Sequence, residues 1–85
     1  MPYVYILCCG DGSFYTGIAK DPHKRLTRHQ AGKASRYTRA HLPVRLVRMR
    51  RVQSWSRALS EEYRIKGLSR TEKAALVRAP RPRSR

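Results

Sequence analysis

Residues 3–18 read Tyr-Val-Tyr-Ile-Leu-Cys-Cys-Gly-Asp-Gly-Ser-Phe-Tyr-Thr-Gly-Ile, and this stretch identifies the first structural unit of the 85-residue chain. Residues 3–8 and 13–18 are rich in aromatic and β-branched side chains, which favour strands. Residues 9–12, Cys-Gly-Asp-Gly, have the composition of a turn, because glycine adopts positive φ at little steric cost. The stretch therefore predicts an antiparallel β-hairpin.

The alternation of side chains in a strand assigns residues 3–8 to two faces. Tyr3, Tyr5 and Leu7 share one face, and the residues between them point the other way. If the turn is centred near residues 11 and 12, Tyr5 and Tyr15 are not directly opposite each other. Whether the two tyrosines share a face depends on the strand register, which the sequence leaves open.

A helix is predicted after the hairpin. Asp21 is a favourable N-cap, Pro22 suits the first helical position, and a glycine at position 32 is a favourable stop, so the helix runs from Pro22 to Ala31. Arg25 and His29 are four residues apart in it and form one polar stripe. An ordinary solvated helix face would explain this stripe equally well.

Residues 32–43 lack clear periodicity and are interpreted as a basic loop over the site. Lys33, Arg36 and Arg39 surround Tyr37 in this segment. We expect these four side chains to contact phosphates and bases of a nucleic acid, although a solvated loop would have the same composition.

Residues 44–52 predict a third strand. The apolar alternation slips at residues 46–47, which indicates either a β-bulge or a strand that is apolar on both faces. A second helix is predicted from Ser54 or Ser56 to Lys66, ended by a glycine, with Trp55 packing against it.

A capping box, Ser69-Arg70-Thr71-Glu72, opens a third helix that ends near Arg78. The predicted fold class is therefore α+β, a small three-stranded antiparallel sheet flanked by three helices within residues 1–78. Residues 79–85, Ala-Pro-Arg-Pro-Arg-Ser-Arg, contain no large apolar side chain and are predicted to be a disordered basic tail.

Composition points to a polyanionic partner. The formal net charge is +15, from 20 basic and 5 acidic residues, and 15 of the basic residues are arginine. Arginine binds phosphate oxygens through two parallel hydrogen bonds, and a positive surface attracts nucleic acid from a distance. We rank nucleic-acid binding above a merely soluble basic surface or a ribosomal or membrane-surface peptide, and expect no membrane partner.

The two cysteines, Cys8 and Cys9, are adjacent, so they form no disulfide framework and lack the further ligands of a zinc site. No apolar run approaches the length of a membrane span, and the first residues do not resemble a signal peptide. We expect an intracellular, cytoplasmic protein in a reducing environment, with association with the nucleoid as an alternative, and treat it as a monomer.

The order of these motifs resembles the GIY-YIG nuclease superfamily, and most closely its small stand-alone single-domain branch. The resemblance covers roughly residues 2–77 and rests on Tyr3-Val4-Tyr5, Tyr15-Thr16-Gly17, Arg25-Leu26-x-x-His29 and Ala58-Leu59-x-x-Glu62-x-x-Ile65-Lys66. It departs from the family pattern at Tyr3-Val4, where the family has Gly-Ile, and at Gln30, where this branch usually has asparagine. The resemblance implies a magnesium- or manganese-dependent endonuclease with Tyr5, Tyr15, Arg25, His29 and Glu62 in its active site.

The chemistry of those five residues is consistent with phosphodiester hydrolysis. Glu62 would hold one Mg²⁺ or Mn²⁺ ion, and Arg25 would neutralise charge on the phosphoryl oxygens. Tyr5 is the expected base for the attacking water, Tyr15 would orient water or phosphate, and His29 would hydrogen-bond a phenol or the phosphate. Since the unperturbed pKa of tyrosine is about 10, this role requires help from the arginine, the metal or His29.

Each of these residues also has an ordinary explanation. Strand tyrosines are commonly core residues, and Glu62 could simply pair with Lys66 four positions later. We expect an endonuclease acting on DNA, with single-stranded or structured DNA favoured and RNA as an alternative substrate. The rival interpretations are a non-catalytic DNA- or RNA-binding module and a nuclease domain that needs a partner protein for targeting.

Overall fold

The computed structural model describes residues 1–78, and residues 79–85, predicted to be a disordered tail, lie outside the described residues. The elements follow the order β1 (Tyr3–Cys8), β2 (Phe14–Ala19), α1 (Pro22–Gln30), α2 (Arg36–Ala40), β3 (Arg45–Arg51), α3 (Trp55–Lys66) and α4 (Arg70–Arg78). The predicted α+β class is confirmed. No helix within the described part is long and apolar enough to cross a membrane.

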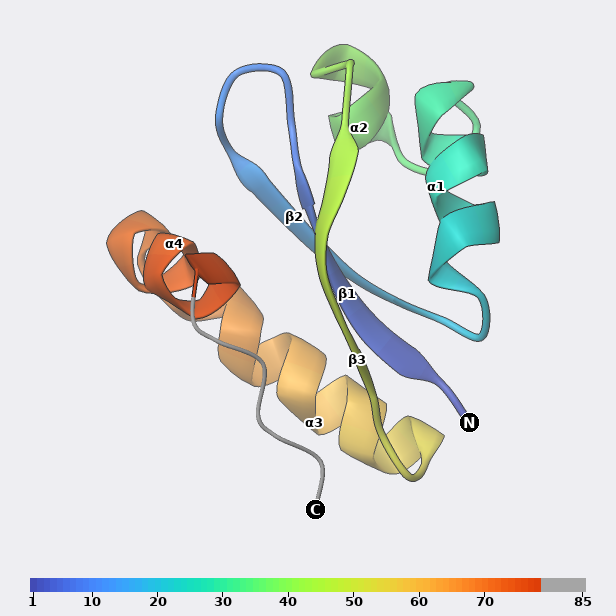
Figure 1. Cartoon of the computed structure of the whole chain (residues 1–85), viewed down its shortest axis with the longest axis vertical. Helices are drawn as coiled ribbons and strands as arrows, with labels where there is room; N and C mark the ends of the chain where they lie inside the picture. Colours follow the sequence, from blue (N-terminus) through green and yellow to red (C-terminus); the bar gives the residue numbers. More distant parts are fainter. Residues whose placement is uncertain (79–85) are drawn as a thin grey trace.

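The sheet has the strand order β2-β1-β3, and both strand pairs are antiparallel (Figure 1). In the hairpin, Tyr5 pairs with Gly17 and Leu7 pairs with Tyr15. Directly paired residues point to the same face, so Tyr5 and Tyr15 are diagonal neighbours on one face of the sheet. The structure thus supplies the register that the sequence left open.

β3 contains the bulge that was one of the two predicted alternatives. Ile6 pairs with Arg48, whereas Leu7 pairs with Leu46, so Val47 is the extra residue. Because of this extra residue, Leu46 packs on the same side of the sheet as Leu7, and Val47 packs on the side of Ile6. The bulge therefore lets two consecutive apolar residues both reach the core.

Helices cover both faces of the sheet, with α1 and α2 on one side and α3 and α4 on the other (Figure 1). On the first side, Tyr5 and Leu7 belong to a cluster that Leu26 of α1 completes. On the second side, Val4 and Ile6 pack with Ala58 and Ile65 of α3 and with Leu76 of α4. The central strand is therefore buried on both faces.

The predicted helix starts are confirmed by their caps. The Asp21 carboxylate accepts the Lys24 N–H at 3.1 Å, and the Ser54 hydroxyl accepts the Arg57 N–H at 3.1 Å. Ser69 and Glu72 form the predicted capping box, in which the Ser69 N–H donates to the Glu72 carboxylate at 2.8 Å and the Glu72 N–H donates to the Ser69 hydroxyl at 3.1 Å.

The interpretation of residues 32–43 as a loop is wrong for residues 36–40, which form the short helix α2. The Ser35 hydroxyl accepts the backbone N–H groups of Tyr37 and Thr38 and so caps this helix. α2 has five residues, too few for a periodic pattern to show in the sequence.

The expected packing of Trp55 is also wrong, because this side chain is 48% exposed at the start of α3. Ala58 and Ile65 occupy the face of α3 that contacts the sheet. The indole therefore lies outside the core, on a part of α3 that the sheet does not cover.

Candidate active site

A chain of buried hydrogen bonds links β1, α1 and α2. The Tyr5 hydroxyl lies 2.9 Å from His29 Nε2, and His29 Nδ1 lies 2.8 Å from the Thr38 hydroxyl oxygen. Tyr5, His29 and Thr38 are each at most 1% exposed. His29 is therefore not part of a solvated stripe, although Arg25, one turn earlier in α1, is exposed.

The hydrogen-bond pattern assigns the tautomer of His29. The Thr38 hydroxyl donates to the Ser35 carbonyl oxygen at 3.3 Å, so its oxygen accepts from His29 Nδ1–H. His29 Nε2 is then the unprotonated nitrogen, and it accepts the Tyr5 O–H. This arrangement places a proton acceptor directly on the Tyr5 phenol.

Burial keeps both members of the Tyr5–His29 pair neutral. Burial is the main reason that the pKa of Tyr5 is raised to about 12. Negative charge at Tyr15 and at Glu62 also raises this pKa, whereas the Arg25 guanidinium lowers it. Burial also lowers the pKa of His29, with Arg25 adding to the effect. Tyr15, Arg25 and Glu62 therefore all act electrostatically on the Tyr5 phenol.

Gly17 makes room for this phenol. A Cβ at position 17 would overlap the hydroxyl and ring carbons of Tyr5. The pairing of Tyr5 with Gly17 across the hairpin therefore lets the phenol extend over the neighbouring strand toward α1. The Tyr5 phenol thus explains sterically why the last residue of Tyr15-Thr16-Gly17 is a glycine.

Tyr15 and Tyr37 extend the aromatic cluster toward the surface. Tyr15 meets His29 edge-on, with ring centroids 5.2 Å apart, and lies nearly parallel to Tyr37 at 6.3 Å. Tyr37 also stacks on His41 at 4.3 Å, and its hydroxyl donates to the Ser13 hydroxyl. Tyr37, which we expected to contact nucleic acid, therefore also ties α2 to the hairpin.

Four of the five acidic residues stabilise local structure. Asp11 accepts hydrogen bonds from Ser13, and Asp21 and Glu72 cap helices. Glu61 binds Arg64 at 2.8 Å and also lies 3.8 Å from Arg50.

Glu62, the fifth, has Lys66 four positions later as its ion-pair partner among residues 1–78, at 3.2 Å, which agrees with the ordinary explanation given above for this residue. It also influences the Tyr5 phenol electrostatically. No group of three or more histidine, cysteine or acidic side chains within residues 1–78 is arranged to hold a metal ion. A single carboxylate with water and substrate phosphate is nevertheless a donor set that Mg²⁺ accepts.

Basic side chains border three shallow hollows on the surface. Lys33, Arg36 and Arg39 line one of about 420 Å³. A second, of about 520 Å³, lies between the start of α1 and Trp55 and includes Arg25.

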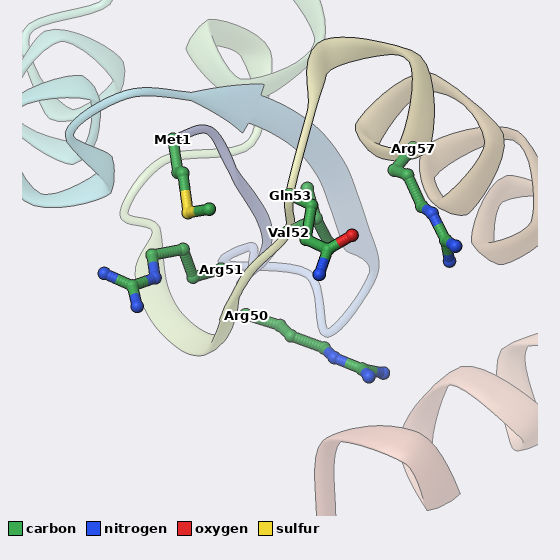
Figure 2. A pocket seen from close by; sticks show the side chains of 6 residues that line it. All are labelled: Met1, Arg50, Arg51, Val52, Gln53 and Arg57. Atoms are coloured by element: carbon green, nitrogen blue, oxygen red, sulfur yellow. The ribbon is translucent and has the colours of Figure 1, made fainter.

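Figure 2 shows the third hollow, of about 420 Å³, where β3 leads into α3. Arg50 and Arg51 extend to opposite sides of β3, and Arg57 extends from α3. The basic surface therefore reaches well beyond the Tyr5 region.

Two residues at the site were not identified from the sequence. The Thr38 hydroxyl binds His29 Nδ1, the ring nitrogen that does not face Tyr5. Thr38 lies in a short helix without sequence periodicity, so no sequence pattern indicated this role. Gln30, noted only as a departure from the family pattern, donates to the Val44 carbonyl and accepts the Val44 N–H at 3.1 Å. It therefore anchors the end of α1 to the chain just before β3.

Comparisons with known proteins agree with this architecture. The family description "GIY-YIG catalytic domain" matches residues 1–75. The chain is 45% identical over 75 residues to UPF0213 protein SSP2268 of Staphylococcus saprophyticus, covering 88% of this chain and 92% of that protein. It is also 45% identical over 76 residues to UPF0213 protein VNG_2274C of Halobacterium salinarum, covering 89% of this chain and 99% of the relative.

Solved structures are similar as well. The NMR structure of the UPF0213 protein BH0048 from Bacillus halodurans superposes with a TM-score of 0.58 at 46% identity, covering 91% of this chain and 83% of that one. The NMR structure of protein EF2693 from E. faecalis has a TM-score of 0.58 at 36% identity, covering 87% of this chain and 80% of that one. None of these names states a substrate.

Proposed function

Because this chain belongs to the GIY-YIG family, we propose that it is a divalent-metal-dependent endonuclease that hydrolyses phosphodiester bonds in DNA, with single-stranded or structured DNA as its preferred substrate. The family implies a nuclease fold and a nucleic-acid substrate. The observation that supports catalysis most directly is the buried Tyr5–His29 hydrogen bond, which lies within electrostatic range of Arg25 and Glu62.

In this proposal, Tyr5 and His29 together act as the base. A phenol whose pKa is about 12 is a poor proton acceptor unless its own proton can leave. As the attacking water gives its proton to the Tyr5 oxygen, the phenolic proton moves to His29 Nε2, which is free to accept it. The proton ends on His29, the water oxygen forms the new bond to phosphorus, and the bond from phosphorus to the departing 3′ oxygen breaks, with that oxygen taking up a proton from solvent.

Arg25 and Tyr15 are proposed to hold the phosphate. Arg25 is exposed and its guanidinium is close enough to the Tyr5 phenol to lower its pKa. It would neutralise negative charge on the phosphoryl oxygens as the water attacks. Tyr15 lies edge-on to His29 and is half-buried, so its hydroxyl would orient the water or the phosphate.

GIY-YIG nucleases generally use a divalent metal, and Glu62 is the residue proposed to hold it here. A bound Mg²⁺ or Mn²⁺ would supply Lewis-acid stabilisation of the departing oxygen. The carboxylate is an oxygen donor suited to a hard cation, and its partner Lys66 is a surface side chain that can move aside.

The first experiment compares wild type with Glu62→Gln and Arg25→Gln on end-labelled single-stranded, duplex and branched DNA. We expect cleavage that requires Mg²⁺ or Mn²⁺ and stops with EDTA. Each substitution should reduce the rate at least about 100-fold, because each removes a charge from the transition state. Binding of DNA by Glu62→Gln should be retained or strengthened.

Glu61→Gln is the matched control. It makes the same change one position earlier in α3, in a carboxylate already engaged by Arg64 and Arg50. Cleavage should continue at near wild-type rates in this variant. If wild type and all three variants bind DNA but none cleaves it with either metal, the protein is a non-catalytic binding module and the proposal is wrong.

A further inference from the structure

α3 has a second apolar stripe that the sheet does not bury. Trp55, Leu59 and Tyr63 follow each other at intervals of four residues, and they are 48%, 58% and 84% exposed. Side chains four positions apart lie on one face of a helix. A row of exposed apolar side chains in so small a domain indicates a binding surface.

This stripe leads to the candidate active site. Glu62 is seven residues after Trp55, which is two helical turns, so it lies on the same side of α3 about 10 Å along the axis. A strand of nucleic acid whose phosphate lies between Arg25 and Glu62 would thus have neighbouring nucleotides over this stripe.

Trp55 also borders a basic hollow of about 520 Å³. The other lining residues are Ala19, Lys20, Asp21, Lys24, Arg25 and Arg28. Asp21, the one acidic residue in this lining, is occupied as the N-cap of α1. The hollow therefore presents positive charge around an exposed indole ring, and its Arg25 belongs also to the candidate active site.

We propose that this hollow binds an unpaired nucleobase next to the cleavage site, with Trp55 stacking on the base and Lys24 and Arg28 contacting adjacent phosphates. Positive charge complements the backbone, and an aromatic face stacks any base without reading its edge. A paired base inside a duplex cannot reach the indole unless it leaves the stack. Trp55 would therefore select single-stranded or locally unpaired nucleic acid; its place beside the cleavage site rests on the proposed function.

Tryptophan fluorescence tests the proposal directly, because Trp55 is the single tryptophan of the chain. Wild-type protein in EDTA is titrated with oligothymidylate, with an abasic strand of equal length, and with a duplex. We expect quenching by oligothymidylate, and little change with the abasic strand or the duplex even where they bind. Equal quenching by the abasic strand would overturn base stacking. A blue shift with phosphatidylserine vesicles and no response to oligothymidylate would indicate a membrane surface and equally overturn it.

Variants provide the second measurement. Stacking on one aromatic side chain corresponds to a loss of affinity of roughly 5-fold or more when it is removed. Trp55→Ala should therefore bind oligothymidylate at least about 5-fold more weakly, whereas Trp55→Phe should retain most of the affinity, and both should bind the abasic strand like wild type. An equal loss of affinity for oligothymidylate and for the abasic strand would mean that Trp55 only shapes the hollow and does not stack on a base, which would overturn the proposal.

This outcome is separable from that of the proposed function. Quenching and loss of affinity in EDTA with no cleavage in Mg²⁺ or Mn²⁺ would retain the base site and reject the nuclease. Metal-dependent cleavage by a protein whose Trp55→Ala variant binds oligothymidylate normally would retain the nuclease and reject the base site.

Discussion

Tyr5 and His29 show how strongly the surroundings of a residue determine its chemistry. The sequence places a tyrosine in a strand and a histidine in a helix, and both are common in cores. In the structure both side chains are buried, and the Tyr5 hydroxyl donates its hydrogen bond to His29 Nε2. Thr38 completes the arrangement by fixing the tautomer of His29. A buried polar network of this kind is stable only when every member has a partner.

The lowered pKa of His29 predicts how stability depends on pH. The unfolded chain takes up a proton at His29 near pH 6.5, whereas the folded chain resists it until lower pH. The unfolded state therefore binds more protons in this range, so the contribution of neutral His29 is fully present above about pH 6.5 and is lost as the pH falls. Free energies of unfolding measured in urea between about pH 7 and pH 5 should show this loss.

His29→Gln provides the comparison. The variant should be less stable than wild type at neutral pH, because the bond from Tyr5 is disturbed, but it should lose less stability on acidification. The remaining ionisable groups are the same in both proteins, so their contributions cancel in the difference. Parallel pH profiles for the two proteins would mean that the acid sensitivity resides elsewhere.

At the scale of elements, local signals in the sequence predicted most of the fold. Asp21, Ser54 and Ser69 mark helix starts because each supplies an oxygen to free backbone N–H groups. The bulge in β3 appeared as a break in alternation. α2 was missed because it is short and is held by tertiary contacts such as the Thr38–His29 and Tyr37–Ser13 hydrogen bonds, which no local sequence pattern indicates.

α3 illustrates a second limit of sequence reasoning. Trp55, Leu59 and Tyr63 have the spacing of a core-facing stripe, and large apolar residues normally identify the buried side of a helix. In the structure the sheet instead covers the smaller stripe of Ala58 and Ile65. Hydrophobicity alone therefore selects the wrong face of α3, which is consistent with selection for a binding surface rather than for stability.

The hairpin yields a prediction at this scale. Gly17→Ala would drive a methyl group into the Tyr5 phenol, so the strands must separate or the phenol must leave His29. Overpacking of this kind costs about 1–3 kcal/mol of stability, and we expect cleavage activity to fall as well. The measurement is a urea unfolding curve combined with the DNA cleavage assay.

Gly67→Ala is the matched control. Gly67 caps α3 with φ of −81°, and the nearest atom to an added Cβ is 3.5 Å away. This variant should fold and cleave like wild type, with stability changed by no more than about 0.5 kcal/mol. If Gly17→Ala behaves like Gly67→Ala, the phenol has more room than the contact indicates.

Across the whole molecule, the acidic side chains are engaged in contacts, whereas most of the basic side chains are not paired with an acid. All five acidic side chains have partners within residues 1–78, and most of these contacts stabilise turns, helix ends or neighbouring side chains. Most of the 20 basic residues have no acidic counterpart, since there are only 5 acidic residues in the chain. The excess positive charge is therefore available for a polyanion, and several of the basic side chains border the three hollows described above.

This distribution predicts the salt dependence of DNA binding. Lys33, Arg36 and Arg39 line one hollow and have no acidic partner among the described residues, so we propose that they contact phosphates. For a single strand, each lost contact should lower the slope of log affinity against log salt by about 0.7. Replacing all three by glutamine should therefore lower the slope by about 2, weaken binding equally for every DNA sequence, and leave the cleavage rate at saturating DNA unchanged. Arg64→Gln removes the same kind of charge from a guanidinium already bound to Glu61 at 2.8 Å, so its slope should match wild type. Equal reductions in slope for Arg64→Gln and for each single change in the hollow would show that binding senses only the net charge of the molecule, because a merely diffuse field does not distinguish paired from unpaired arginines.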